Sequence, residues 1–179
     1  MLEIQNACLV VVDVQGKLAQ LMFDKESLFK NIRILIQAAR ILDIPILWCQ
    51  QVPEALGPTV PEVAELLADE EPIDKACFSC CGDERFTAEL NALGKEQVLL
   101  CGIEAHICIY QTAMDLMEGG LDVTIVADAV SSRTEQNKET ALDRLSAEGA
   151  NISSTEMALF ELLKTARHPQ FREIARLVK

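Results

Sequence analysis

Short apolar runs alternate with amphipathic segments along this chain. The runs cover residues 7–14, 44–49, 97–103 and 123–127, with a weaker one at 151–153. Residues 9–12 read Leu-Val-Val-Val, without the polar alternation of a half-exposed strand. Strands that are apolar on both faces are typical of a parallel sheet covered by helices on both sides. The pattern therefore predicts an α/β fold.

The segments between these runs have helical periodicity. Apolar residues recur three or four positions apart at Leu28, Ile32, Leu35, Ile36, Ala39 and Leu42, and shorter stripes occupy 63–67, 86–93, 142–145 and 159–163. Gly119-Gly120 and Gly149 end two helices, and Ser153-Ser154-Thr155-Glu156 has the pattern of a capping box. With a short strand expected near 73–79, this alternation predicts a parallel sheet of about six strands in a doubly wound order.

No linker or low-complexity segment interrupts this pattern, so residues 1–179 are predicted to form a single domain. The stretch 51–61 contains three prolines and one glycine and is predicted to be a loop near the ligand site. No run reaches the roughly 20 apolar residues of a membrane span. The first residues carry no basic patch followed by a long apolar stretch, which favours a cytoplasmic protein.

The charge and the cysteine content narrow the class of partner. A net charge of −12 and a pI near 4.6 argue against a nucleic-acid partner, because proteins that neutralise many phosphates present basic stripes. The seven cysteines lack the paired spacing of a small secreted scaffold, so free thiols are expected. A small-molecule substrate is the remaining expectation.

Three residues at the ends of predicted strands are candidates for chemistry. Cys108 follows the run 97–103, where a helix should begin, and a helix N-terminus favours the thiolate over the thiol. Asp13 ends the first run, where a buried charge needs a partner, and Lys75 lies where the third strand should emerge. In an open parallel sheet, ligands bind beyond the carboxyl ends of the strands. Each residue taken singly also fits an ordinary use: a core thiol, a helix N-cap or a surface lysine.

These residues stand in motifs that resemble the isochorismatase-like cysteine hydrolases over nearly the whole chain. The motifs are Val12-Asp13-Val14-Gln15, then Lys75 with Phe78-Ser79, then Gly102-Ile103-Glu104-Ala105-His106-Ile107-Cys108, and Asp128-Ala129-Val130-Ser131-Ser132-Arg133. The resemblance implies a Rossmann-like three-layer αβα sandwich. It also implies a homo-oligomer, a dimer or larger.

The same resemblance implies the role of each candidate. Asp13, Lys75 and Cys108 would form a catalytic triad in which Cys108 attacks an amide or ureido carbonyl, Asp13 serves as general base and then acid, and Lys75 supports both charges. The backbone N–H groups of Glu104 and Cys108 would form the oxyanion hole. A cis peptide would lie between Ile103 and Glu104.

Departures from the family pattern narrow the reaction. Nicotinamidases of the family carry an Asp and two His after the second strand as metal ligands, whereas this chain has Trp48-Cys49-Gln50-Gln51-Val52-Pro53. We therefore expect no metal and no cofactor. This chain has the family's cysteine, Cys108, which favours a carbonyl substrate. The sequence most resembles the isochorismatase domain-containing branch, whose substrates are unassigned.

Two alternatives remain open at this stage. One is isochorismatase-type vinyl ether hydrolysis with Asp13 as the acid and Cys108 incidental. The other is a non-enzymatic thiol or metal-binding module built on Cys77, Cys80 and Cys81. A zinc ribbon would need a second cysteine pair at a suitable distance along the chain, and the sequence contains none.

Other residues near the motifs are candidates for lesser roles. Gln15, Phe23, Trp48, Gln50 and His106 are candidates for the pocket wall, with core packing the more common use of aromatic residues. His106 is also a rival base for Cys108, a role that the resemblance does not support. Asp128 and Arg133 are expected to brace loops, by pairing with each other.

Overall fold

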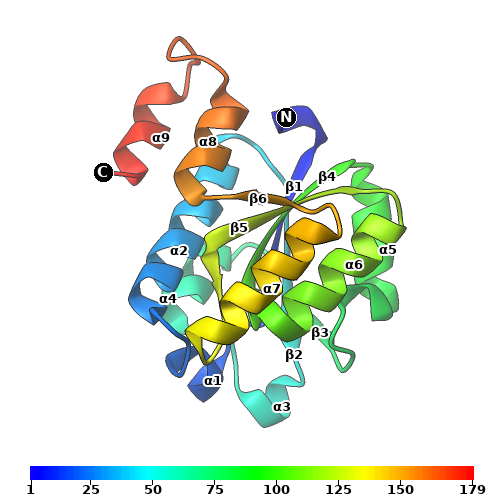
Figure 1. The fold of residues 1–179 in the computed structure, drawn as a ribbon. Coiled ribbons are helices and arrows are strands. Elements are labelled where there is room, and N and C mark those ends of the chain that lie inside the picture. Colours follow the sequence, from blue (N-terminus) through cyan, green and yellow to red (C-terminus); the bar gives the residue numbers. More distant parts are fainter.

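The computed structural model describes residues 1–179 and is built around one six-stranded sheet (Figure 1). The strands are β1 (Ala7–Val12), β2 (Ile46–Gln51), β3 (Ile73–Lys75), β4 (Gln97–Ile103), β5 (Asp122–Ser131) and β6 (Asn151–Ser153). All neighbours pair in parallel, in the order β3-β2-β1-β4-β5-β6. The predicted doubly wound parallel sheet is confirmed.

Helices cover both faces of the sheet. They are α1 (Gly16–Gln20), α2 (Lys25–Ile41), α3 (Pro53–Leu56), α4 (Pro61–Ala64), α5 (Glu84–Leu93), α6 (Tyr110–Glu118), α7 (Glu135–Ala147), α8 (Thr155–Leu163) and α9 (Phe171–Leu177). In Figure 1, α5, α6 and α7 lie on one side of the sheet, and α2, α4, α8 and α9 lie on the other. The result is a three-layer αβα sandwich. None of the helices is long and apolar enough to cross a lipid bilayer.

Strand β1 explains why the sequence shows no polar alternation at the centre of the sheet. Its residues Leu9 and Val11 pack into the core beneath α2 and α8, while Cys8, Val10 and Val12 pack into the core beneath α5, α6 and α7. All five side chains are buried. Because both faces lie under helices, every position of the strand has to be apolar.

Local details differ from the predicted boundaries. Helix α8 begins at Thr155 with Ser154 as its cap, whose Oγ accepts the Met157 N–H at 3.3 Å, so the cap lies one residue after the first serine of the motif. The predicted loop 51–61 contains the short helix α3. Strand β5 continues past the apolar run to Ser131, with a register irregularity opposite β4.

Strands β1 and β4 lie side by side where the chain reverses its direction of winding, which in this fold opens a crevice at their carboxyl ends. Gly102 of β4 pairs with Val12 of β1. Its φ is +119°, and a Cβ there would lie 2.1 Å from the Val12 carbonyl oxygen. Only glycine fits this position, and the close approach brings the segments after the two strands together.

Candidate active site

Asp13 directly follows β1 and is held in a fixed, unusual conformation. Its φ is +54°, in the left-handed region that few residues other than glycine adopt. Its N–H donates to the Cys49 carbonyl at 3.1 Å, which ties it to the neighbouring strand β2. The residue is 2% exposed, so its carboxylate depends on protein partners rather than water.

Lys75 supplies the main partner of Asp13. It ends β3, its side chain is 0% exposed, and its Nζ lies 2.7 Å from Asp13 Oδ2. The same Nζ donates to Gln51 Oε1 at 2.7 Å and to the carbonyls of Cys77 at 3.2 Å and Phe78 at 3.1 Å. An ammonium group carries three donors, so these four acceptors use its full capacity.

Cys108 lies in a single π-helical turn, Ala105–Ile109, between β4 and α6. The peptide bond between Ile103 and Glu104, which leads into this turn, is cis. The Glu104 carbonyl accepts the N–H groups of Ile107 at 3.1 Å and Ile109 at 3.2 Å, while the Glu104 N–H has no acceptor in the protein. The turn therefore holds Cys108 just beyond β4.

A cavity of about 130 Å³ brings the chemistry together. Its lining consists of Asp13, Leu18, Gln51, Leu56, Phe78, Ile103, Glu104, Ile107 and Cys108. Asp13 and Cys108 face this cavity, and Lys75 lies behind Asp13. The remaining carboxylate oxygen, Asp13 Oδ1, is the one buried side-chain polar atom without a hydrogen-bond partner. Lys75 thus occupies one oxygen of Asp13 and leaves the other available.

Burial dominates the electrostatics of the three groups. It raises the pKa of Asp13, and the opposing effect of Lys75 does not cancel this rise. Burial lowers the pKa of Lys75, but the Asp13 carboxylate and the neighbouring thiols outweigh burial, so that this pKa is raised overall. Lys75 is therefore charged, and Asp13 is a stronger base than an exposed carboxylate.

The electrostatics of Cys108 correct one expectation from the sequence. Position at a helix start predicted a lowered thiol pKa, whereas burial and then the Asp13 carboxylate raise the pKa of Cys108, against a lowering by Lys75. The helix-start argument counts only the dipole, and the desolvation and the carboxylate come from tertiary structure. The resting group is a thiol, and an attack on a carbonyl requires transfer of its proton to a base.

Three of the residues proposed for the pocket wall lie outside the cavity lining and support it from behind. Gln15 accepts the Gln51 N–H at 2.6 Å and donates to the Gln51 carbonyl at 3.1 Å. Trp48 Nε1 donates to Thr59 Oγ1 at 2.9 Å, and Gln50 Oε1 accepts the Thr59 N–H at 2.9 Å. These side chains hold the 51–61 segment against the sheet. The sequence could not distinguish this bracing role from substrate contact.

The other two proposed wall residues, Phe23 and His106, also lie outside the lining. Phe23 is 38% exposed and lines a separate small hollow with Asp128 and Lys138. His106 Nδ1 is 2.9 Å from Ser132 Oγ. That hydrogen bond, rather than contact with the cavity that Cys108 lines, accounts for the histidine.

Asp128 and Arg133 brace loops, but not by pairing with each other. Asp128 Oδ1 accepts both the N–H and the Oγ1–H of Thr155 at 2.8 Å. Arg133 donates its N–H and its Nε–H to Glu104 Oε1, each at 3.0 Å. Each therefore fixes a segment beside the site through a different partner.

The cysteine-rich segment after β3 contributes backbone rather than thiols. The carbonyl of Cys77 accepts from Lys75, and the N–H of Cys80 donates to Thr112 Oγ1 at 2.9 Å. Nowhere in the protein are three or more His, Cys, Asp or Glu side chains arranged to hold a metal ion. The observed geometry gives no support to a metal module at Cys77, Cys80 and Cys81.

The site also contains residues that the sequence reading missed. Gln51 joins Lys75 to the cavity wall, and its Nε2 donates to the Ala76 carbonyl at 2.7 Å. It is a polar residue that ends an apolar run, so the reasoning that found Asp13 could have found it. Leu18, Leu56 and Ile107 carry no such signal, because an apolar wall residue looks like a core residue.

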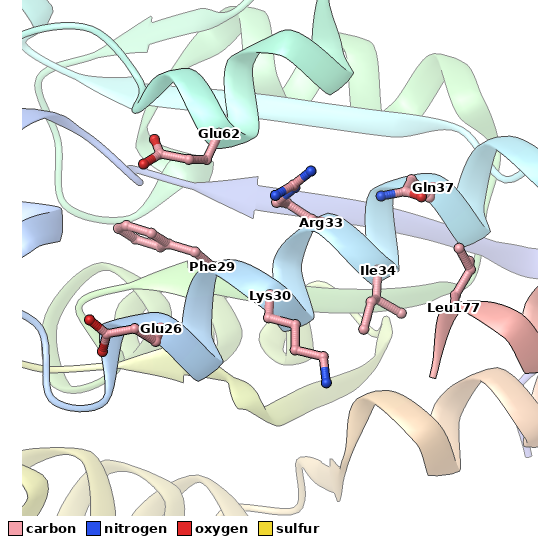
Figure 2. A pocket seen from close by; sticks show the side chains of 8 residues that line it. All are labelled: Glu26, Phe29, Lys30, Arg33, Ile34, Gln37, Glu62 and Leu177. Atoms are coloured by element: carbon pink, nitrogen blue, oxygen red, sulfur yellow. The ribbon is translucent and has the colours of Figure 1, made fainter. Parts of the chain in front are cut away.

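A hollow larger than this cavity lies elsewhere, and its lining contains no cysteine, histidine or hydroxyl group. It measures about 330 Å³ and is shown in Figure 2, where Phe29 and Arg33 project from α2, Glu62 from α4 and Leu177 from α9. Its other lining residues are Glu26, Lys30, Ile34 and Gln37. Paired acidic and basic side chains on a helix face are ordinary surface features.

Comparisons with known proteins agree with the fold and the motifs. The isochorismatase domain profile matches residues 7–157. Isochorismatase domain-containing protein 2 of Danio rerio is 42% identical over 99% of this chain and 89% of its own length. A secreted isochorismatase effector of Phytophthora sojae is 37% identical over 97% of this chain and 85% of its own length.

Two solved structures are similar over nearly the whole chain. The MAR1 ribonuclease of Caenorhabditis elegans has a TM-score of 0.93 and 38% identity, covering 99% of this chain and 91% of that one. The YcaC gene product of Escherichia coli, described as an octameric hydrolase of unknown specificity, has a TM-score of 0.88 and 25% identity, covering 98% and 94%. The chain therefore belongs to the isochorismatase family and is a hydrolase.

Proposed function

We propose that this hydrolase cleaves a small amide or ureido C–N bond through a thioester on Cys108. One observation carries the proposal: Lys75 occupies Asp13 Oδ2, Asp13 Oδ1 is buried without a hydrogen bond, and Asp13 and Cys108 line the same cavity. A buried base beside a buried thiol is the arrangement that activates a cysteine nucleophile. The family resemblance of the motifs that contain Asp13, Lys75 and Cys108 supports the same roles.

The proposed reaction passes two protons in turn through Asp13, one in each half of the reaction. Asp13 Oδ1 takes the thiol proton as Sγ attacks the carbonyl carbon, and the same proton passes to the nitrogen as the C–N bond breaks. The amine leaves, and the acyl group stays on Sγ as a thioester. Water then gives a proton to Asp13 and attacks the thioester, and that proton restores the Cys108 thiol. The net reaction consumes one water and releases an acid and an amine.

The turn around Cys108 offers donors for the oxyanion. The Glu104 N–H has no acceptor in the protein, and we propose that it and the Cys108 N–H receive the carbonyl oxygen in the tetrahedral intermediate. Such donors commonly contribute roughly 3–4 kcal/mol each to transition-state stabilisation. Lys75 keeps its charge throughout and stabilises the carboxylate form of Asp13 between the proton transfers.

Two other reactions deserve comparison with this one. Vinyl ether hydrolysis needs only an acid, so Asp13 would suffice and Cys108 would be incidental. Cleavage of RNA, suggested by the name of the C. elegans relative, needs groups that hold phosphate, whereas the acidic side chains Asp13 and Glu104 line this cavity and no basic side chain does. The lack of a basic side chain in the lining argues against a phosphate substrate. The presence of Cys108 in the lining argues against vinyl ether hydrolysis, in which the thiol would have no role.

The decisive experiment combines turnover with trapping of the intermediate. Ammonia release from a panel of small amides is measured for the wild type, Cys108→Ala and, as a matched control, Cys81→Ser, whose thiol lies outside the cavity lining. We expect Cys108→Ala to fall to background and Cys81→Ser to keep wild-type turnover. Acid quenching should leave the acyl mass on the Cys108 peptide. Full turnover by Cys108→Ala would contradict the thioester and favour the vinyl ether reaction.

We also propose that the chain forms a homo-oligomer. The E. coli relative is described as octameric. Large apolar side chains, including Ile152, Met157 and Phe160, are exposed around β6 and α8. Light scattering after gel filtration tests this, and a monomer mass at micromolar concentration would contradict it.

A further inference from the structure

We infer that the cavity selects an uncharged amide with a short aliphatic acyl chain and rejects substrates that carry a carboxylate. This inference rests on the proposed function, since it names the substrate class for the same nucleophile. Three observations support it: the state of the polar groups in the lining, the apolar character of the other walls, and the absence of a free cation in the lining. Each can be traced to named contacts.

The polar side chains of the lining are mostly occupied by the protein itself. The amide of Gln51 is used at both ends, by Lys75 and by the Ala76 carbonyl. Glu104 Oε1 accepts two hydrogen bonds from Arg133. What remains for a substrate is Asp13 Oδ1, the Cys108 thiol and the backbone N–H groups of Glu104 and Cys108. These groups suit the reacting carbonyl and its N–H group. The second Glu104 oxygen, Oε2, can only accept a hydrogen bond, so no cationic group is left to bind a carboxylate substituent.

The rest of the wall is apolar. Leu18 comes from α1, Leu56 from α3 and Phe78 from the segment after β3. Ile103 is the first residue of the cis peptide, and Ile107 lies in the turn that follows it. No hydroxyl, imidazole or cationic side chain is among the lining residues. Desolvating a carboxylate or a hydroxyl against these walls would be unfavourable, because nothing there replaces the lost water. A methyl or methylene group would gain from the same burial.

The charges around the cavity act in the same direction. Asp13 and Glu104 are the ionisable carboxyl groups of the lining, and the cations paired with them are already committed. Lys75 has a fully buried side chain and four acceptors around its Nζ. Arg133 is outside the lining and directs its Nε to Glu104. An anionic substrate would therefore find no cation in the lining with which to form an ion pair.

The size of the cavity limits the acyl chain. Its volume of about 130 Å³ is slightly below that of a cavity of roughly 150 Å³ that accepts benzene. A chain of three or four carbons beyond the carbonyl fits this space, and a bicyclic or sugar-bearing group does not. The fitted class is therefore a primary amide of a short aliphatic acid.

A pair of alkylating reagents tests the charge selectivity without any turnover. Iodoacetamide and iodoacetate deliver nearly the same group and differ in charge, and peptide mass spectrometry reads the rate at each cysteine. Cys81 of the same molecule is the internal control, because it experiences the net charge of −12 but lies outside the lining. We expect the preference for iodoacetamide at Cys108 to exceed that at Cys81 by at least about tenfold. Equal preferences at the two thiols would overturn the inference.

A substitution at the mouth of the cavity sharpens this test. Phe78 is 55% exposed, so Phe78→Lys places a cation in the lining with little risk to folding. It should reduce the preference at Cys108 towards that at Cys81. Leu21→Lys adds the same charge at a 63% exposed position outside the lining and should leave the preference unchanged. An equal effect of both variants would show that only the overall charge matters and would overturn the inference.

A matched pair of amides separates the substrate class from the proposed function. 3-Methylbutanamide and malonamate have the same branched shape, with a carboxylate in malonamate replacing the isopropyl group. Hydrolysis of the neutral amide at least about tenfold faster supports both proposals. Equal or faster hydrolysis of malonamate overturns the inference and leaves the C–N hydrolase standing. Hydrolysis of neither, with the alkylation preference intact, supports the selectivity of the cavity and contradicts the amide reaction.

Discussion

Two buried acidic residues end the two central strands and are used differently. Asp13 follows β1 and Glu104 follows β4, they are 2% and 5% exposed, and each is paired with a cation. Lys75 takes one oxygen of Asp13 and leaves the other buried and unpartnered. Glu104 instead accepts two hydrogen bonds on one oxygen from Arg133, including one from the backbone. An acid with a free buried oxygen is equipped for proton transfer, whereas one bonded to backbone holds a loop.

The partners of the two acids differ as much as the acids do. The side chain of Lys75 is 0% exposed, and that of Arg133 is 54% exposed. A buried cation cannot exchange its partner for water, so the Asp13 pair is rigid and its loss would be costly. The exposed Arg133 is screened by solvent, and its ion pair contributes little to stability. Burial of the partner therefore distinguishes the pair that we propose for catalysis from the pair that holds a loop.

Turnover should show the largest difference between the two acids. We expect Asp13→Asn to lower kcat by about 10²–10⁴-fold, because a general acid and base is lost. Glu104→Gln keeps an oxygen acceptor for Arg133 and should lower kcat by less than about tenfold, since removal of a positioning contact costs far less than removal of the base. Ammonia release from a small amide measures both. Equal losses in the two variants would show that Asp13 has no role beyond structure.

The loss of the two cations should also have different effects on the free energy of unfolding. Lys75→Met leaves the buried Asp13 without its partner and should lower the free energy of unfolding by about 3–5 kcal/mol. Arg133→Met removes an exposed ion pair and keeps the backbone hydrogen bond, so about 1 kcal/mol or less is expected. Urea denaturation gives both values.

The double variant Asp13→Asn with Lys75→Met is the control for this experiment. It removes both buried charges, so it should be more stable than Lys75→Met alone. If the two losses simply added, the pair would not be coupled, and the proposed dependence of Asp13 on Lys75 would be wrong.

The pH dependence of alkylation at Cys108 should shift in opposite directions when Asp13 or Lys75 is replaced. Because burial and Asp13 raise the pKa of Cys108, the thiol is protonated at neutral pH and its alkylation should accelerate as pH rises. Asp13→Asn removes a group that raises this pKa and should move the profile to lower pH. Lys75→Met removes a group that lowers it and should move the profile to higher pH.

The informative result would be Asp13→Asn reacting faster with iodoacetamide at pH 8 while hydrolysing amides more slowly. That combination separates the acidity of the thiol from the role of Asp13 as a base. Glu104→Gln is the matched control and should leave the profile in place. A shift of the Asp13→Asn profile to higher pH would contradict the electrostatic account of the site.

The sequence alone predicted those charged residues of the site that lie at the ends of strands. Asp13 stands out because a charged residue after an apolar run has to find a buried partner, and Lys75 stands out because it lies where the third strand should emerge. The order of the strands also follows from the alternation of runs and helices. Glu104 also follows an apolar run, but its partner Arg133 lies 29 residues further along the chain, after β5, and nothing in the local sequence identifies it. Tertiary contacts of this kind are invisible to local pattern.

The pocket and the thiol acidity were beyond sequence reasoning for different reasons. Leu18 and Leu56 come from short helices whose apolar residues look like any core residue until the chain is folded. The pKa of Cys108 depends on how deeply the turn after β4 is buried and on which face meets Asp13. The position of Cys108 at the start of a helix indicates neither quantity. The predicted direction of its pKa shift was wrong for that reason.

His106 offers the smallest expected effect and a test of which base serves Cys108. It is two residues from the thiol in sequence, yet its Nδ1 contacts Ser132 Oγ at 2.9 Å and it is absent from the cavity lining. His106→Gln retains a side chain able to hydrogen bond with Ser132, so kcat should change by less than about threefold, far below the 10²–10⁴-fold effect of losing a general base. A loss approaching that of Asp13→Asn would transfer the base role from the acid after β1 to the histidine after β4.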